Sequence, residues 1–276
     1  MAVLTIAREL GAMVGGEELA LCNTLKLHCV TKATLEKRFA EMGIERELLQ
    51  RFDECRPGLL GAISKSAEYY WETLRTVLLQ ELMQDNIAFV GRGGNFLLSG
   101  LVNCLRIKLI APEPFRIRQI ATQQSISEAE AKKLIRQSDS GREKFCKFYY
   151  GKSWSDPANY DLIVNTENIS MEELADILPA LLPAPPSETQ KKQLGLTLQA
   201  QIIRHTLLGI PDLQLLCPDV QFDENGTVTL HGNVPSVSVA KRIEETVKNM
   251  PQVTAVDNQL TVATGNVPNR LPPMMH

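Results

Sequence analysis

The sequence has no marked excess of charge and only a few scattered cysteines. Its 29 lysine and arginine residues are balanced by 32 aspartate and glutamate residues, so its formal net charge at pH 7 is −3. A chain this close to neutrality is not expected to bind nucleic acid. The six cysteines include no Cys-x-x-Cys pair, so neither a disulfide framework nor a zinc site of that type is expected. Scattered thiols are typical of a reducing compartment, and we therefore expect a cytoplasmic protein.

Long apolar runs are absent as well. No stretch approaches the ~18 consecutive apolar residues of a membrane-spanning helix, so we expect no integral membrane segment. The first ten residues already include Arg8 and Glu9, with no basic segment ahead of an apolar one, so we expect no signal peptide. The four histidines lie far apart without ligand-spaced partners, and no metal site is expected. Hydrophobic residues still make up 44% of the chain, enough for a substantial core.

A proline-rich stretch divides the chain. Residues 178–193 contain four prolines and then a short polar segment, which cannot continue a helix or pair in the middle of a sheet. We predict a linker over residues 181–193, between a first domain over 1–180 and a second over 194–265. The last residues, 266–276, hold three prolines and no periodic pattern, and are predicted to be a flexible tail.

The first domain alternates strand and helix patterns. Short apolar runs predict buried strands over 3–7, 87–90, 105–110 and 162–164. Helical patterns separate them, over 16–28, over 62–84, from Ser127 onward and over 170–178. This order predicts an α/β fold with a parallel sheet covered by helices on both faces. Ligands of such sheets bind beyond the carboxyl ends of the strands, so candidate site residues are sought there.

The second domain has a different pattern. An amphipathic helix is predicted over 196–208, a hairpin around Asn225-Gly226, a second helix over 236–249 and a last strand within 252–263. The order α-β-β-α-β predicts a small α+β domain, in which two helices pack on one face of a sheet.

Three clusters stand at the predicted strand ends, and each has two interpretations. The first is the loop Gly11 to Gly16, whose Gly-x4-Gly spacing is typical of a phosphate-binding loop that leads into a helix. Such a loop usually continues with Lys and Ser or Thr, whereas Glu17 and Glu18 follow here. A carboxylate at this point can occupy the anion site itself. The alternative is that Glu17 and Glu18 have no binding role, because acidic residues in the first turn of a helix interact favourably with the helix dipole.

The second cluster is basic. Residues 106–152 hold eleven Lys or Arg against five Asp or Glu, and Arg136, Asp139 and Arg142 stand near its centre. A basic flap above the strand ends suits phosphoryl transfer, because charge spreads over the oxygens of the transferred group. The alternative is a solvated helix face with ion pairs at a spacing of three residues, Arg136 with Asp139 and Asp139 with Arg142.

The third cluster is the turn Gly91-Arg92-Gly93-Gly94. An arginine in a glycine-rich turn at the ligand edge can bind a phosphate in bidentate fashion or hydrogen-bond a base. The alternative is an ordinary tight turn whose arginine points into water.

Four segments, in order along the chain, carry a family resemblance. They read Leu-Thr-Ile-Ala-Arg-Glu-Leu-Gly over 4–11, Val-Gly-Arg-Gly-Gly-Asn-Phe over 90–96, Ile-Arg-Gln-Ser-Asp-Ser-Gly-Arg over 135–142 and Tyr-Asp-Leu-Ile-Val-Asn-Thr over 160–166. Together they resemble the cytidylate kinase-like family, a branch of the P-loop nucleoside monophosphate kinases, over about residues 1–180. Residues 195–263 are similar to a BON domain, most clearly over 225–234.

The resemblance implies a P-loop kinase fold that transfers phosphate from ATP, with Mg²⁺, to a CMP-like pyrimidine nucleoside monophosphate. By motif match it implies the following roles: a phosphate loop of Gly11, Gly15 and Gly16 with Arg8 and Glu17 beside it, a monophosphate site at Arg92 and Gly93, and a catalytic lid with Arg136, Asp139 and Arg142. Three positions depart from the family pattern: Glu17 replaces the loop lysine, Gly93 replaces the Asp of a Gly-Arg-Asp turn, and residues 28–32 keep only Lys32 of a Tyr-Asp-Lys-Glu-Leu segment. The missing positive charge would then come from Arg8, Arg92 or the lid arginines.

These departures leave a second function open. The first domain is then a catalytically degenerate nucleotide-binding domain, and the protein acts as a regulator or scaffold through its BON domain. A third interpretation makes the BON domain a lipid or protein attachment module. Residues 194–276 hold five Lys or Arg and seven acidic residues, so attraction to anionic lipid is not expected. A protein partner or self-association is favoured for this domain.

Overall fold

The computed structural model describes residues 2–44, 65–84, 86–210 and 218–262, and it divides into two compact units. Within the described residues, the N-terminal unit comprises 2–44, 84 and 86–186, and the C-terminal unit comprises 65–83, 187–210 and 218–262. No helix of the described part is long and apolar enough to cross a membrane. Each unit has its own sheet and its own hydrophobic core.

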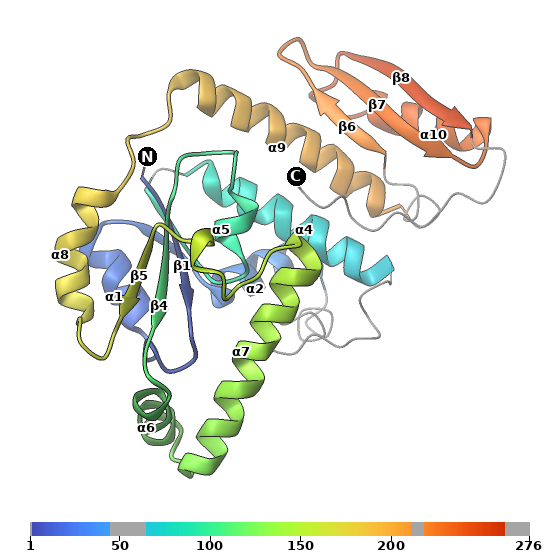
Figure 1. The fold of residues 1–276 in the computed structure, drawn as a ribbon. Helices are drawn as coiled ribbons and strands as arrows, with labels where there is room; N and C mark the ends of the chain where they lie inside the picture. Colours follow the sequence, from blue (N-terminus) through green and yellow to red (C-terminus); the bar gives the residue numbers. More distant parts are fainter. Residues whose placement is uncertain (1, 45–64, 85, 211–217, 263–276) are drawn as a thin grey trace. The chain divides into compact units, whose positions relative to one another are not determined.

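The N-terminal unit is built on a five-stranded sheet in which all neighbouring strands are parallel (Figure 1). Its strands are β1 (Val3–Arg8), β2 (His28–Val30), β3 (Ile87–Val90), β4 (Leu105–Ile110) and β5 (Leu162–Asn165). The sheet order is β2-β3-β1-β4-β5, so the chain crosses from one side of β1 to the other between β3 and β4. Such a crossing opens a crevice at the carboxyl ends of the strands, where ligands of parallel sheets bind. The predicted parallel α/β sheet is confirmed.

The strand residues alternate between two covered faces. Leu4 and Ile6 of β1 belong to a core that includes Leu21 of α1 (Glu17–Thr24) and Leu174 of α8 (Met171–Leu181). Thr5, between them in sequence, faces α5 (Gly94–Leu97), because a Cβ built on Gly94 would lie 3.8 Å from its Cγ2. Both faces are therefore packed, as a fully covered parallel sheet requires. The unit also contains α2 (Lys32–Glu41), α6 (Glu113–Gln124), α7 (Glu128–Tyr150) and the short 3-10 helix η1 (Pro157–Asn159).

The starts of α7 and α8 followed the sequence better than the ends of α1 and α8. The capping boxes at Ser127 and Ser170 open α7 and α8 as predicted. The helix predicted over 16–28 ends at Thr24, two residues before the left-handed backbone of Lys26 (φ 55°), and 28–30 form the unpredicted strand β2. Helix α8 also continues beyond the predicted end at Leu178, through Pro179 to Leu181.

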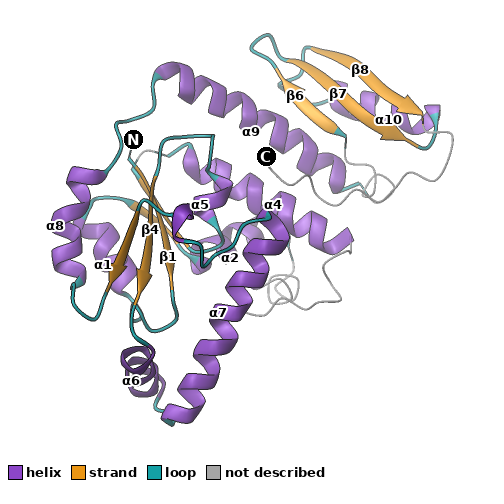
Figure 2. Ribbon diagram, viewed as in Figure 1, coloured by secondary structure: helices purple, strands orange, loops and turns teal. Residues whose placement is uncertain are grey.

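The C-terminal unit combines a three-stranded sheet with long helices. Its elements are α4 (Lys65–Leu82), α9 (Glu188–Leu208), β6 (Asp219–Phe222), β7 (Thr227–Val234), α10 (Val237–Lys248) and β8 (Ala255–Val262). The sheet order is β6-β7-β8, antiparallel between β6 and β7 and parallel between β7 and β8, with α10 running along it in Figure 2. One hydrophobic core joins α9, α10 and the strands, for example through Ile203, Ile243 and Leu230. The predicted order α-β-β-α-β and the hairpin at Asn225-Gly226 are confirmed.

Helix α9 begins eight residues before its predicted start, at Glu188 rather than Leu196. The Ser187 side chain accepts from the backbone N–H of Gln190, and this capping box starts the helix inside the predicted linker. Only residues 182–187 separate α8 from α9. The predicted linker over 181–193 is therefore wrong for residue 181 and for residues 188–193, which are helical.

Helix α4 packs on α9 rather than within the N-terminal unit, in which the sequence had placed it. The Gln201 side chain of α9 donates from Nε2 to Oε2 of Glu72, at 2.7 Å, and to Oγ1 of Thr76, at 3.2 Å. The Arg204 guanidinium lies 3.0 Å from Oε1 of the same Glu72. The outer limits predicted for the two domains stay predictions, and residues 266–276 lie outside the described residues.

Candidate functional site

The loop between β1 and α1 holds the first predicted cluster, and its shape depends on glycine. Gly11 has a φ of +85°, and a Cβ on it would lie 2.8 Å from the backbone oxygen of Arg116 on α6. Gly16 is the N-cap of α1 with a φ of 95°. Left-handed backbone is strained for residues with a side chain, and the close approach at Gly11 leaves no room for one. The loop has the glycine-dependent turn that was predicted for it, with Gly15 next to the side chain of Gln123.

The carboxylate of Glu17 is bound by this loop. Its Oε2 accepts a hydrogen bond from the backbone N–H of Val14 at 2.7 Å. Gly16, the N-cap of α1, has no side chain to accept from the first backbone N–H groups of the helix. Glu17 is thus an internal carboxylate bound to one backbone donor of the loop, and its occupation of an anion site stays a prediction.

Asp139 of α7 links the loop to two arginines. Its Oδ1 accepts from the backbone N–H of Leu10 at 3.2 Å, and its Oδ2 accepts from Nη1 of Arg116 at 2.6 Å. Nη1 of Arg142 lies 3.3 Å from Oδ1 and also donates to Oγ of Ser138 at 2.7 Å. The Arg142 side chain is 8% exposed and that of Arg116 is 11% exposed, so these charges are largely shielded from solvent. Asp139 thus joins the backbone of Leu10 to Arg116 and Arg142.

The predicted lid residues are divided by the structure. Asp139 and Arg142 lie together as an ion pair at the predicted spacing, whereas Arg136 is 67% exposed and lies 3.5 Å from Glu113 of α6. The expected pair of Arg136 with Asp139 is therefore replaced by a pair with Glu113. All three residues belong to one continuous helix of 23 residues. Arg136 faces solvent and does not join the cluster at the loop.

Arg116 is a site residue that the sequence analysis did not identify. Its Nε lies 3.3 Å from Oε2 of Glu9 and donates to the Ala111 carbonyl at 3.0 Å, while Nη1 donates to the Leu10 carbonyl at 3.3 Å. Together with Asp139, these partners bind the Arg116 guanidinium from several sides. They therefore connect α6 to the loop that follows β1. Its only local signal is the basic composition of residues 106–152.

The turn after β3 holds Arg92 and Gly93 in unusual backbone. Arg92 has a φ of 55° and is 5% exposed, and its carbonyl accepts from Oη of Tyr150 at 2.7 Å. Gly93 has a φ of +66°, and a Cβ there would lie only 2.3 Å from Cε2 of Tyr150. Gly93 is therefore required by the ring of Tyr150, which excludes an Asp at this position in the present packing. The strained backbone of a buried arginine is typical of functional sites.

Lys108 of β4 is a second buried cation that the sequence analysis missed. Its Nζ donates to the Trp154 carbonyl at 3.0 Å and lies 4.0 Å from the centre of the Trp154 ring and 5.3 Å from that of Tyr160. Burial lowers the pKa of Lys108, and the charges of Glu9 and Asp139 oppose that shift. Cation–π contacts compensate for part of its lost hydration. Lys108 lies opposite Ala7 in the β1–β4 pairing.

Arg8 is the last residue of β1 and pairs in register with Leu109, directly before the loop. Its charge lowers the pKa of the Cys29 thiol, although the hydrogen bond from Cys22 acts on that pKa more strongly. In the part of the chain that the structure describes, no group of three His, Cys, Asp or Glu side chains could hold a metal ion. The site thus consists of backbone donors, glycine turns and paired arginines.

Two parts of the chain match known protein families. Residues 3–168 match the model of the cytidylate kinase-like family, and residues 200–264 match the BON domain. A cytidylate kinase of Sulfolobus acidocaldarius is 38% identical over 96 residues, which cover 34% of this chain and 52% of that protein. A uronate isomerase of Corynebacterium glutamicum is 30% identical over 129 residues, which cover 47% of this chain and 24% of that protein. The chain thus spans about half of one relative and a quarter of the other.

Solved structures resemble the chain more weakly. A protein of Eubacterium ventriosum has a TM-score of 0.47 at 16% identity, over 66% of this chain and 98% of that one. A shikimate kinase of Acinetobacter baumannii has a TM-score of 0.39 at 13% identity, over 66% of this chain and 92% of that one. A deoxyadenosine kinase of M. mycoides has a TM-score of 0.36 at 12% identity, over 65% of this chain and 97% of that one. Scores this low add nothing to the assignment by family.

Proposed function

Because the chain belongs to the cytidylate kinase-like family, we propose that its N-terminal unit binds nucleotides beyond the carboxyl ends of β1 and β3 and transfers phosphate from ATP to a pyrimidine nucleoside monophosphate. The observation that carries this proposal is the hydrogen bond from the Val14 N–H to the Glu17 carboxylate. It supports the presence of an anion-binding loop, because the loop already binds an anion of its own. Glu17 is then a competitor that ATP must displace.

The strength of that competition follows from the contact. A hydrogen bond to a charged group contributes about 1.5–3 kcal/mol. Glu17 is half-buried, so the lower end applies, and the carboxylate should weaken the binding of ATP roughly tenfold. A polyphosphate offers several oxygens to the loop and can therefore replace a single carboxylate.

The other residues have roles that their contacts support. In this proposal Arg142, paired with Asp139, contributes positive charge to the transferred phosphate, and Arg92, which follows β3, contacts the acceptor phosphate. Magnesium bound to ATP would neutralise part of the phosphate charge. Such an ion is coordinated by only one or two protein carboxylates. With glutamate in place of the loop lysine, the remaining positive charge must come from the arginines.

One observation favours a second function, that of a nucleotide-binding regulator or scaffold without transfer. The Arg116 guanidinium is already bound to Glu9 and Asp139 and to two carbonyls, so its charge is not available to a phosphate in this arrangement. In this case the BON domain makes the functional contact, with a protein partner or a second copy of the chain.

The binding proposal is tested by titrating wild type, Glu17→Ala and Glu18→Ala with MgATP in a calorimeter. Both variants remove one acidic residue from the first turn of α1, but only Glu17 accepts from the loop. We expect Glu17→Ala to bind MgATP roughly tenfold more tightly and Glu18→Ala to change little. Equal affinities for all three proteins would contradict a phosphate site in this loop.

Transfer is tested separately, by a coupled assay of the full chain with MgATP and CMP, dCMP or UMP. Turnover of any of the three supports the kinase, and a further gain for Glu17→Ala supports competition by the carboxylate. Binding of MgATP without turnover would reject the kinase and leave the regulator.

A further inference from the structure

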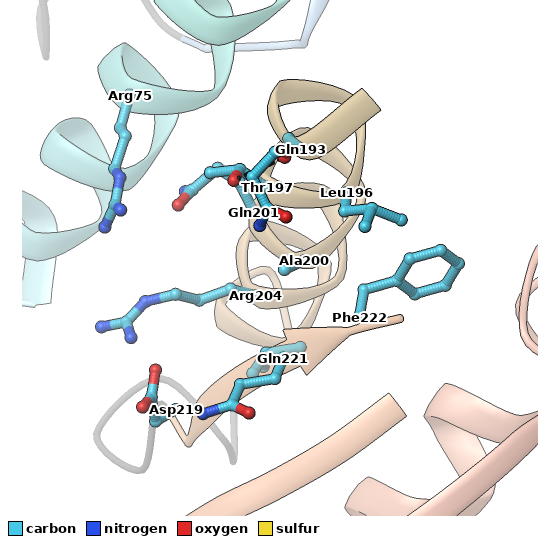
Figure 3. Close-up of a pocket in the computed structure, with 11 residues that line it drawn as sticks. Arg75, Gln193, Leu196, Thr197, Ala200, Gln201, Arg204, Asp219, Gln221 and Phe222 are labelled. Carbon is cyan, nitrogen blue, oxygen red and sulfur yellow. Dashed lines mark hydrogen bonds between the residues drawn. The ribbon is translucent and has the colours of Figure 1, made fainter. Parts of the chain in front are cut away.

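The C-terminal unit contains a cavity that the proposed function does not use. It lies between α4, α9 and β6 and has a volume of about 320 Å³. Figure 3 shows the side chains of Arg75, Arg204 and Asp219 on one side of this space and those of Leu196 and Phe222 on the other. Cavities of this size hold small organic ligands, and an apolar wall opposite a few polar groups is typical of them.

Arg75 is the unusual group in this wall. It is half-buried, its Nε is shielded from solvent, and that atom has no hydrogen-bond partner among the described residues. Burial lowers the pKa of Arg75, the charges of Glu72 and Asp219 oppose that shift, and the charge of Arg204 adds to it. An arginine offers five N–H donors in a planar fork, and leaving one of them buried without a partner is unfavourable.

Two charged side chains near Arg75, those of Arg204 and Glu72, pair with each other. Arg204 lies 3.0 Å from Oε1 of Glu72, whose side chain is 1% exposed, and Oε2 of Glu72 accepts from Gln201. Glu72 and Arg204 therefore neutralise each other inside the helix pair. Arg75 lines the cavity, and the charges of Glu72 and of the exposed Asp219 act on it.

The two walls together define the class of ligand. The planar guanidinium of Arg75 fits a carboxylate, which it can bind with two parallel hydrogen bonds. Asp219 repels added negative charge, so a monoanion is favoured over a phosphate dianion. Leu196 and Phe222, with Ala200 and Val220, offer apolar surface to a hydrocarbon body. We propose that this cavity binds a small amphipathic monocarboxylate, with its carboxylate on Arg75 and its apolar part against α9 and β6.

The test uses the full chain and phenylacetate as the probe, with ligand-observed NMR as the measurement. Phenylacetamide has the same shape without the charge, and inorganic phosphate is the dianion. We expect saturable binding of phenylacetate, binding of phenylacetamide weaker by roughly tenfold or more, and no displacement by phosphate. No binding of phenylacetate, equal binding of the amide, or displacement by phosphate would each overturn the proposal.

Two variants assign the binding to this cavity. Arg75→Gln should weaken phenylacetate binding by roughly tenfold or more, whereas Arg242→Gln, which removes an exposed arginine of α10, should not. Thr197→Trp fills the cavity from α9 without removing the cation and should abolish binding. Binding that survives both Arg75→Gln and Thr197→Trp would place the ligand elsewhere and overturn the proposal.

The melting temperature separates a binding role for Arg75 from a structural one. Nε of Arg75 has no hydrogen-bond partner among the described residues and burial disfavours its charge, so unliganded Arg75→Gln should melt close to the wild-type temperature. A clear decrease in melting temperature would give Arg75 a structural partner and contradict the assignment. This outcome does not depend on the nucleotide site of the other unit.

Discussion

In the N-terminal unit Arg116 is bound on both sides by carboxylates, whereas in the C-terminal unit Nε of Arg75 has no hydrogen-bond partner among the residues that the structure describes. The loop donor of the first unit is likewise satisfied, by Glu17. A site whose groups are already paired binds an outside ligand only by exchange, so its affinity is reduced by the internal contact. A site with an unsatisfied group has no such competitor. Charge content alone therefore does not indicate how readily a site binds a ligand.

The largest effect is expected where the internal pairing of the N-terminal unit is broken. Asp139→Ala leaves Arg116 and Arg142 largely buried without their shared carboxylate. Since Asp139 itself is 21% exposed, we expect the free energy of unfolding to fall by about 3 kcal/mol, the lower end for a broken buried pair. Denaturant unfolding of wild type and Asp139→Ala measures this difference in the free energy of unfolding.

The matched control is Arg136→Ala on the same helix. Arg136 is 67% exposed, so losing its pair with Glu113 should change the free energy of unfolding by less than about 0.5 kcal/mol. If both variants lost the same stability, Asp139 would not be the organising charge of the site.

A smaller loss is expected from Gly93→Ala. The new Cβ would lie 2.3 Å from the ring of Tyr150 in backbone with a φ of +66°, so both overpacking and backbone strain apply. We expect a loss of about 2–3 kcal/mol, measured by thermal unfolding. Gly100→Ala is the control, since its φ is +80° but no atom lies within 4 Å of the added Cβ, and about 1 kcal/mol is expected. Equal losses would show that Tyr150 does not determine glycine at 93.

The buried position of His205 in the C-terminal unit predicts that the stability of the protein depends modestly on pH. His205 stacks on Tyr69 with ring centres 5.3 Å apart, and its Nε2 lies 2.9 Å from Oγ1 of Thr73. Burial lowers the pKa of His205, so the unfolded chain takes up a proton first as the pH falls below about 6.5. The stability of wild type should be unaffected by His205 above this pH and decrease below it.

The corresponding measurement compares melting temperatures of wild type and His205→Gln between pH 7.5 and 5.5. The variant should lose less stability than wild type over this interval, because it lacks the group that must charge on unfolding. A steeper decrease for the variant would mean that His205 is protonated in the fold.

Sequence patterns predicted the elements whose signals are local. The strands β1, β3, β4 and β5, the capping boxes of Ser127 and Ser170 and the Asn225-Gly226 hairpin all depend on neighbouring residues. The start of α9 was also encoded locally, by Ser187 and Gln190, but the prolines before it outweighed this signal. The position of α4 was not predictable in this way, since its partners Gln201 and Arg204 lie more than 120 residues away in sequence.

The same distinction applies to the site. The contact of Glu17 with Val14 spans three residues, and the sequence indicated that a carboxylate at this point can occupy the loop. The pairing of Arg116 with Glu9 and Asp139 joins residues from three separate elements, and no spacing in the sequence indicates it. Glycine is needed at position 93 because of the ring of Tyr150, which is 57 residues away in the sequence. From the sequence alone, Gly93 is recognised only as the loss of the Asp in the family pattern. Roles in catalysis remain predictions for all of these residues.

The most direct test of the central claim observes the Val14 amide itself. In ¹H–¹⁵N NMR spectra of the full chain, Glu17→Ala should move the Val14 amide resonance, because its acceptor is lost. MgATP should then move it again at lower concentrations in Glu17→Ala than in wild type. A Val14 resonance that responds to neither the substitution nor MgATP would contradict an anion-binding loop held by Glu17.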